Sequence, residues 1–250
     1  MQKGLKDLLF LEINKEFKGW DFSYIENTGR VQEQPLSWNY RTLIMQYIKK
    51  SKVMLDMGTG GGEFLSSLEE LPNKVMATER YKPNIEVAKN ILKPLGIKVY
   101  SIQNDKKLPF SNETFDLVIN RHESYDCEEL LRIMKPRGVF VTQQVGGMNG
   151  FELNEYLRAE TSRYEFWNKR YAVDKLILKG FKVEVQEENF VKTRFYDVGA
   201  VVYWLKVIPW QVKEFSIEVY YDRLERIQEI INSIGYIELT CHRFLIVAKK

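Results

Sequence analysis

Residues 53–65 read Val-Met-Leu-Asp-Met-Gly-Thr-Gly-Gly-Gly-Glu-Phe-Leu, and this stretch decides the fold. A short apolar strand ends near Asp56, a glycine-rich turn follows, and a helix pattern begins. An α/β sheet builds a nucleotide-type pocket in this way, at the carboxyl end of a strand. Glycine lets the backbone turn sharply and lets a ligand approach the main chain closely. We therefore predict a ligand site at the end of this strand.

The residues around the glycines narrow the choice of ligand. No Lys-Ser/Thr pair follows them, which disfavours a Walker-type phosphate loop, and Glu63 occupies the third glycine position of the dinucleotide pattern. The carboxylates of Asp56 and Glu63 would repel a pyrophosphate and suit a cationic or neutral ligand. An amino-acid ammonium and a ribose meet that requirement. The alternative is a strand-to-helix turn without a ligand.

A second acidic residue supports a ribose. Residues 74–78 read as the next strand, and Glu79 follows about 20 residues beyond the glycine turn. An acid at this place is positioned to hydrogen-bond a ribose diol. The alternative for Glu79 taken alone is a solvated loop acid.

Five segments together resemble the class I S-adenosylmethionine-dependent methyltransferases, with a type 11-like methyltransferase domain. They are the first motif at 56–62, the acid at 79, and the segments 104–110, 115–120 and 134–140. The sequence departs from the family pattern twice: Asn104 stands at a position that is usually acidic, and Arg137 replaces the first glycine of the "L-K-P-G-G" turn. The resemblance covers about residues 50 to 145.

This resemblance implies that S-adenosyl-L-methionine is the cofactor and S-adenosyl-L-homocysteine the product. Asp56 would orient the loop, the glycines would contact the amino-acid part, and Glu79 would take the ribose. Asn104 would accept a hydrogen bond from the adenine amino group. The complete predicted cofactor set is Asp56, Gly58, Thr59, Gly60, Glu79, Asn104, Asp105, Asn120 and Arg121, of which the last two line the methyl-donor end.

The pattern of strands and helices predicts an α/β fold. Alternation of this kind indicates a mostly parallel, doubly wound sheet with helices on both faces. The family resemblance implies a seven-stranded Rossmann-like sheet whose last strand is antiparallel. Strands are predicted at 53–57, 74–78, 97–101, 115–119, 138–145, 181–189 and 242–248, and helices at 61–70, 83–93, 127–134, 150–158 and 169–179.

We predict four parts along the chain: an N-terminal helical arm or lid at 1–50, the cofactor-binding α/β core at 51–190, a helical cap insertion at 191–240, and the final core strand at 241–250. In the family the last two strands meet at the catalytic face, so the insertion is expected to emerge over the active site. Its aromatic residues suit a cap on an organic substrate. The alternatives are a packing arm for the first part, and for the insertion a helical pair that closes the sheet edge, with or without a dimer contact.

Two histidines are the candidates for catalysis. His122 follows the fourth strand and His242 starts the seventh, so both face the cofactor end, and histidine titrates near neutrality. The alternative for each is a packed or solvated side chain. The candidates for substrate binding are Tyr125 beside His122, Gln143 at the end of the fifth strand, and Arg194 and Tyr196 in the insertion.

Composition limits the class of protein. The chain has 250 residues and a net charge of +3, which by itself does not imply a nucleic-acid partner. Cys127 and Cys241 fit a reducing cytosol, so we expect a cytoplasmic protein; there is no C-x-x-C pair, so no metal site is predicted. No stretch is long and apolar enough to span a bilayer.

The favoured function is therefore methyl transfer to a small organic molecule, by a monomer or a homodimer. One alternative is an RNA methyltransferase acting on rRNA or tRNA, although the N/D-P-P-Y/F tetrad is absent after the fourth strand and a nucleic-acid partner is not favoured. Another is a non-catalytic protein that only binds S-adenosylmethionine.

Overall fold

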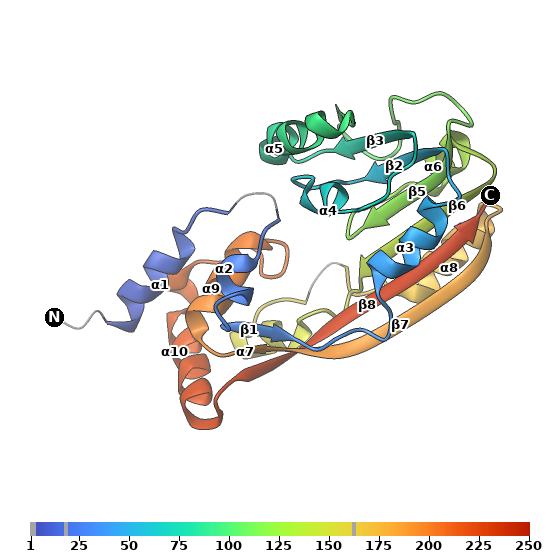
Figure 1. Ribbon diagram of the computed structural model, residues 1–250. Helices are drawn as coiled ribbons and strands as arrows, with labels where there is room; N and C mark the ends of the chain where they lie inside the picture. The colour runs from blue at the N-terminus through green and yellow to red at the C-terminus, as the bar shows by residue number, and fades with distance from the viewer. Residues whose placement is uncertain (1–3, 18–19, 162–163) are drawn as a thin grey trace.

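An eight-stranded mixed sheet forms the centre of the molecule, with strand order β1-β7-β8-β6-β5-β2-β3-β4 (Figure 1). The computed structural model describes residues 4–17, 20–161 and 164–250. Five neighbouring strands are parallel: β2 (Val53–Met57), β3 (Lys74–Glu79), β4 (Lys98–Ser101), β5 (Phe115–Arg121) and β6 (Met134–Val145). Their carboxyl ends therefore lie at one edge, which is where a doubly wound sheet binds its ligand.

The remaining strands form an antiparallel ribbon. β8 (Ile237–Lys249) is antiparallel to β6 and to β7 (Lys182–Phe195), and the short β1 (Val31–Glu33) is antiparallel to β7. The doubly wound α/β fold is confirmed, with eight strands rather than seven because β1 adds one edge strand. The ribbon also exceeds the predicted strands at 181–189 and 242–248, since β7 and β8 stay paired out to Phe195 and Ile237.

Helices cover both faces of the parallel strands. The front face packs against α3 (Tyr40–Ile48), α4 (Glu63–Ser66) and α5 (Lys82–Leu92), which is followed by the 3₁₀ turn η1 (Lys93–Leu95). The back face packs against α6 (Cys127–Ile133) and α8 (Lys169–Leu178). Side chains alternate between the two faces along each strand. Met54 and Asp56 therefore point to the front, and Leu55 and Met57 to the back.

The helix predicted over 61–70 is wrong in length, because α4 ends at Ser66. The Ser66 and Ser67 hydroxyls donate hydrogen bonds to the carbonyls of Glu63 and Phe64, at 3.0 and 2.7 Å. Serine hydroxyls that bond the backbone in this way compete with helix propagation.

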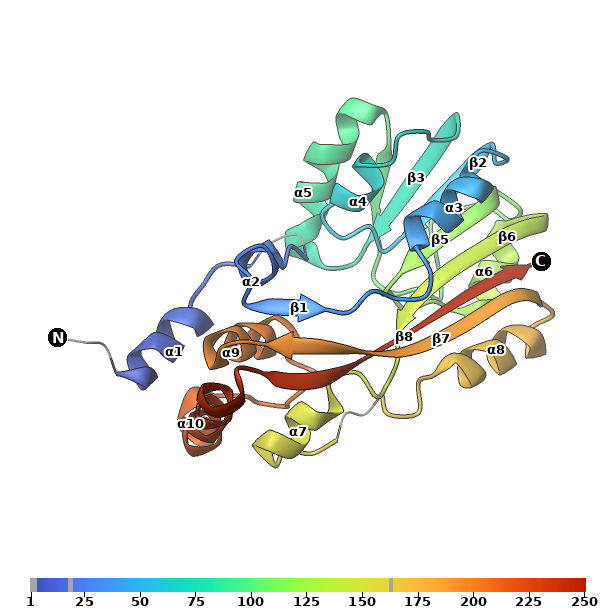
Figure 2. The ribbon, with the colours of Figure 1, turned by 60° about the horizontal axis from the view of Figure 1, so that its bottom comes forward.

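A third core lies where the ribbon extends beyond the parallel strands (Figure 2). Five helices pack there: α1 (Leu5–Ile13), α2 (Ser23–Glu26), α7 (Phe151–Leu157), α9 (Val198–Val207) and α10 (Ile217–Ile234). Side chains cap the N-termini of α9 and α10. The Asp197 carboxylate accepts a hydrogen bond from the Ala200 amide, and the Ser216 hydroxyl accepts one from the Val219 amide. Within the described ranges no helix combines the length and the hydropathy that a membrane crossing requires.

Candidate cofactor and acceptor site

The glycine turn after β2 is hydrogen-bonded to the end of β3. The Gly58 and Thr59 amides both donate to the carbonyl of Thr78, at 3.1 and 2.9 Å. Gly58 has φ of +79°, and a Cβ built there would lie 2.4 Å from the Cβ of Glu123. A side chain at position 58 is therefore excluded both by backbone conformation and by contact.

Glu79 holds the turn and its own loop together. One of its carboxylate oxygens accepts from the Gly60 amide at 2.7 Å, and the other accepts from the Arg80 and Tyr81 amides at 2.8 and 2.7 Å. Burial is the largest effect on this carboxyl and raises its pKa. A carboxylate has about four lone-pair sites, so acceptor capacity remains for a ligand hydroxyl after these three bonds.

Asp56 lies on the front face at the base of the turn and is 5% exposed. Burial raises the pKa of its carboxyl to about 6; the Thr59 hydroxyl and Arg121 oppose this rise, and Glu79 adds to it. A carboxylate that has lost its water here gains from a cationic neighbour.

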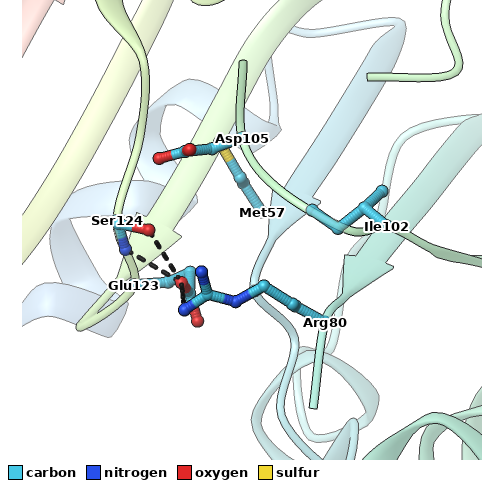
Figure 3. Close-up of a pocket in the computed structure, with 7 residues that line it drawn as sticks. Met57, Arg80, Ile102, Asp105, Glu123 and Ser124 are labelled. Atoms are coloured by element: carbon cyan, nitrogen blue, oxygen red, sulfur yellow. Dashed lines mark hydrogen bonds and ion pairs between the residues drawn. The ribbon is translucent and has the colours of Figure 1, made fainter. Parts of the chain in front are cut away.

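A pocket with about 240 Å³ of empty space opens beside the turn (Figure 3). Arg80 and Glu123 span it, with the Arg80 Nη2 and Glu123 Oε1 atoms 3.6 Å apart. Asp105 lines the pocket, whereas Asn104 is exposed and accepts from the Lys106 amide at 3.0 Å. The structure thus places an acid in this pocket at position 105 rather than at the family's usual position 104.

Asn120 lies at the end of β5 and is fully buried. Its amide nitrogen donates to the Met57 carbonyl at 3.2 Å, and its amide oxygen accepts from the Thr142 hydroxyl and the Gln144 amide at 2.8 and 2.6 Å. The Tyr40 hydroxyl donates to its carbonyl at 3.1 Å. These bonds tie β2, β5 and β6 together beneath the predicted methyl-donor end.

Arg121 is the next residue and points to the front face. Its guanidinium lies 4.9 Å from the ring centre of Phe64, and among residues 4–17, 20–161 and 164–250 it forms no hydrogen bond or ion pair. Desolvation by the surrounding protein lowers its pKa; Arg243 acts in the same direction, and Tyr40 and Asp56 oppose it. The charges of Asp56 and of a second guanidinium, Arg243, therefore both act on Arg121.

His122 ends a chain of hydrogen bonds whose direction follows from the donors present. The Trp38 indole N–H, which is only a donor, bonds the Gln143 amide oxygen at 2.8 Å, so the amide nitrogen of Gln143 faces the His122 Nε2 at 3.0 Å. His122 Nε2 must accept, which makes the ring neutral with its proton on Nδ1. His122 is exposed on one side, yet desolvation by the surrounding protein, then the charges of Arg243 and Arg121, hold its pKa well below the usual value.

His242 has a different environment. Its Nδ1 accepts from the Met148 amide at 3.2 Å, so its Nε2 carries the proton and donates to Glu188 at 3.0 Å. The side chain is 1% exposed and stacks on Phe190 at 4.2 Å between ring centres. Burial lowers its pKa. The structure does not bring His242 together with His122, because it lies on the back face of β8.

The predicted substrate residues also separate. Gln143 joins the His122 chain, whereas Tyr125 packs on the back face against Phe140, and its hydroxyl has no hydrogen-bond partner in the described part of the chain. Arg194 pairs with Glu238 at 2.9 Å, and the Tyr196 hydroxyl donates to Gln32 at 2.8 Å. Arg194 and Glu238 lie on the face of the ribbon opposite to Thr193 and Leu239.

Sequence reasoning missed the roles of Trp38 and Arg243. Nothing local marks Trp38, because it acts through Gln143, which is 105 positions away in the chain. Arg243 carried a usable signal: strand alternation places it on the face opposite to its neighbour His242.

Comparison with known proteins agrees with this geometry. A family described as "Methyltransferase domain" matches residues 48–195. No curated protein matches the chain.

Solved structures share the fold at low identity. A putative methyltransferase from Bacillus halodurans C-125 is 16% identical, with a TM-score of 0.61 over 84% of this chain and 98% of its own. A functionally unknown protein from Deinococcus radiodurans R1 is 11% identical, with a TM-score of 0.61 over 91% and 99%. The [4+2]-cyclase SpnF is 12% identical, with a TM-score of 0.54 over 84% and 79%. The match over residues 48–195 covers more than half of the chain, which therefore belongs to the class I methyltransferase-domain family.

Proposed function

We propose that this protein binds S-adenosyl-L-methionine at the ends of β2, β3 and β4 and transfers its methyl group to a small organic acceptor. One observation carries the proposal: the buried Glu79 carboxylate accepts from one backbone amide of the glycine turn and from two amides of its own loop, and it keeps acceptor capacity for a hydroxyl. Such an arrangement suits a ribose held beside a close-approach turn.

The surrounding residues fit the other parts of this ligand. Asp56, desolvated and at the base of the turn, favours a ligand ammonium. Asp105 in the pocket is the acceptor for an adenine amino group, with Asn104 beside it on the rim. Gly58 and Gly60, both with positive φ, let the ligand reach the main chain. Glu123 must turn away from Gly58 to admit it.

S-adenosylmethionine supplies an already activated methyl group, so the protein has to align the acceptor and exclude water. We infer that His122 orients the acceptor with its Nδ1–H, since Gln143 occupies its Nε2 lone pair. A general-base role would require Gln143 to release that nitrogen. His242, with both nitrogens bonded and its ring buried, would act by positioning the loop after β6.

We further propose that the N-terminal arm and the insertion cover the site together. Trp20 of the arm lies 6.5 Å from Tyr81 and 5.9 Å from Trp210, measured between ring centres. Tyr81 belongs to the loop that Glu79 holds, and Trp210 belongs to the insertion. The two predicted covering segments thus meet beside the proposed ribose site.

Calorimetric titration with S-adenosylmethionine tests the cofactor site. We expect micromolar binding that Asp56→Ala and Glu79→Ala each weaken at least tenfold, or about 1.4 kcal/mol. Asp174→Ala, an exposed acid on α8, is the matched control and should bind normally. A well-folded wild-type protein that does not bind would overturn the proposal.

A transfer assay separates the alternatives. Labelled S-adenosylmethionine is incubated with the protein and either a small-molecule extract or total RNA. Label in the small-molecule fraction supports the proposed acceptor class. Label in RNA supports an RNA methyltransferase, and cofactor binding without transfer to either supports a non-catalytic protein.

A further inference from the structure

Two guanidiniums lie beside the ring of Phe64, which stands in α4 immediately after the glycine turn. The Arg121 guanidinium is 4.9 Å from the ring centre, and that of Arg41 is 5.4 Å from it. Arg41 already donates to the carbonyl and the hydroxyl of Ser67, at 2.7 and 2.5 Å. Arg121 forms no hydrogen bond or ion pair within the described ranges, so its N–H donors are available to a ligand.

The sheet register places Arg121 near Asp56. Asp56 on β2 pairs with Ile119 on β5, and Arg121 follows Ile119 by two residues. Residues two apart on a strand share a face, so Asp56 and Arg121 both project from the front face. Each acts on the charge of the other, yet they form no direct ion pair in the part of the chain that the structure describes. A cation and an anion thus stand beside the glycine turn without being joined to each other.

The charges on this face leave no positive excess. Arg243 acts on Arg121 as a like charge and is itself paired with Glu33 at 3.2 Å. Glu26, exposed at the C-terminal end of α2, also feels the charge of Arg121. The face therefore carries two guanidiniums and three carboxylates, those of Asp56, Glu26 and Glu33. A free anion gains little from such a field, whereas an amino-acid group, whose ammonium and carboxylate cancel, fits it without adding charge.

We propose that Arg121 binds the α-carboxylate of S-adenosyl-L-methionine, while Asp56 faces the α-ammonium of the same group. This inference rests on the proposed function. A guanidinium offers a carboxylate two parallel N–H donors. The cation–π contact with Phe64 holds the guanidinium next to the glycine turn and uses none of those donors. Glu26 is the acid that competes for Arg121 when no ligand is bound.

Calorimetric titration at pH 7.5 with three ligands that differ at the amino-acid end tests the proposal. S-adenosyl-L-homocysteine carries the carboxylate and the ammonium, its decarboxylated analogue keeps only the ammonium, and 5′-methylthioadenosine lacks both. The wild type should bind S-adenosylhomocysteine at least tenfold more tightly than the decarboxylated analogue. Arg121→Met should weaken S-adenosylhomocysteine binding at least tenfold and should not weaken binding of the other two ligands. Arg121→Lys, which keeps the charge but loses the paired donors, should lie between the two proteins.

Arg41→Met is the matched control, because it removes the other guanidinium beside Phe64. It should change the preference for the carboxylate less than twofold. Glu26→Gln removes the competing acid and should leave that preference at least as large as in the wild type. Thermal melting shows whether each variant is folded, and Arg121→Met removes no hydrogen bond of the described chain.

The outcomes separate this inference from the function on which it rests. Equal wild-type binding of S-adenosylhomocysteine and its decarboxylated analogue, or the same loss for both in Arg121→Met, would overturn the role of Arg121 and leave the cofactor site standing. A loss in Arg41→Met as large as that in Arg121→Met would also overturn it. A folded wild type that binds none of the three ligands would overturn the proposed function itself.

Discussion

The parallel strands and the antiparallel ribbon build their sites in different ways. At the ends of β2 and β3, backbone amides of a turn and a loop converge on one carboxylate, all within residues 58 to 81. On the ribbon, side chains distant in sequence meet: Arg243 of β8 pairs with Glu33 of β1. The site at the glycine turn is therefore encoded locally, whereas the side-chain contacts of the ribbon depend on the whole fold.

The N-terminal arm shows the same dependence. Arg30 makes two hydrogen bonds to Asp197, at 2.8 and 2.6 Å, and a third to Glu12 at 3.2 Å. Asp197 also caps α9 through the Ala200 amide. One charged cluster therefore joins the arm, β1 and the insertion.

The largest expected effect concerns whether the two regions fold together. Phe195→Ala in the third core and Phe140→Ala in the back-face core should each lower the free energy of unfolding by about 3–5 kcal/mol. Because β7 and β8 run through both regions, we expect one shared unfolding transition in urea. Tryptophan fluorescence and circular dichroism, recorded on the same samples, should give the same midpoint. Two separate transitions, with Phe195→Ala shifting only one, would show that the regions are independent.

The next effect is on the cofactor side and depends on pH. The pKa of Asp56 is about 6 in the folded protein and 3.8 in the unfolded chain. Between pH 3.8 and pH 6 the folded state therefore binds more protons than the unfolded state. The free energy of unfolding should therefore fall as pH rises from 4 to 7, by about 2 kcal/mol more in the wild type than in Asp56→Asn. Urea titrations of both ligand-free proteins measure this difference, and parallel pH profiles would contradict it.

A smaller effect, on cofactor affinity, is expected at the pocket beside the glycine turn. Glu123→Ala removes the Arg80 ion pair and the side chain that lies against Gly58. A surface ion pair contributes about 0–1 kcal/mol, so S-adenosylmethionine should bind about two- to fivefold more tightly. Glu86→Ala, which breaks a surface pair with Lys89, is the control in the same calorimetric titration. Weaker binding by Glu123→Ala would identify Glu123 as a ligand instead.

The last prediction changes no residue of the site and concerns the protonation states of the two histidines. Nitrogen-15 NMR at pH 7.5, above the usual histidine pKa of about 6.5, should find both rings neutral, because the pKa of each is lowered, with the proton on Nδ1 of His122 and on Nε2 of His242. The chain has only these two, so a His242→Gln sample assigns the signals. A proton on Nε2 of His122 would contradict the Trp38–Gln143–His122 chain.

These regions also explain what the sequence could predict. The strand, the turn and Glu79 are linked by short-range patterns, and in the structure Asp56 and Glu79 lie close enough at this edge of the sheet for their charges to interact. The helix predicted over 61–70 forms only over Glu63–Ser66, because two serine hydroxyls bond the backbone locally. β1 was missed because a three-residue strand has no periodicity of its own and exists only through pairing with Thr193–Phe195.

The residues that bind the substrate were harder to predict from the sequence, for a physical reason. Arg194 and Tyr196 were selected for their chemistry, yet which face a strand residue occupies depends on register, and here their side chains engage Glu238 and Gln32. Arg243 was overlooked although its alternation with His242 was readable. Partners such as Glu33, separated from Arg243 by 210 positions, are set by tertiary contacts that no local pattern contains.

The position of β8 has a consequence for synthesis on the ribosome. β8 lies between β6 and β7, yet it follows both of them in the chain, after α9 and α10. Until β8 has emerged, β6 has an open edge and the fourteen residues of β7 lack their main partner. Unpaired strand edges are templates for intermolecular pairing. The nascent protein is therefore most exposed to aggregation just before its final strand inserts, and truncation before residue 237 should leave an insoluble product rather than a smaller enzyme.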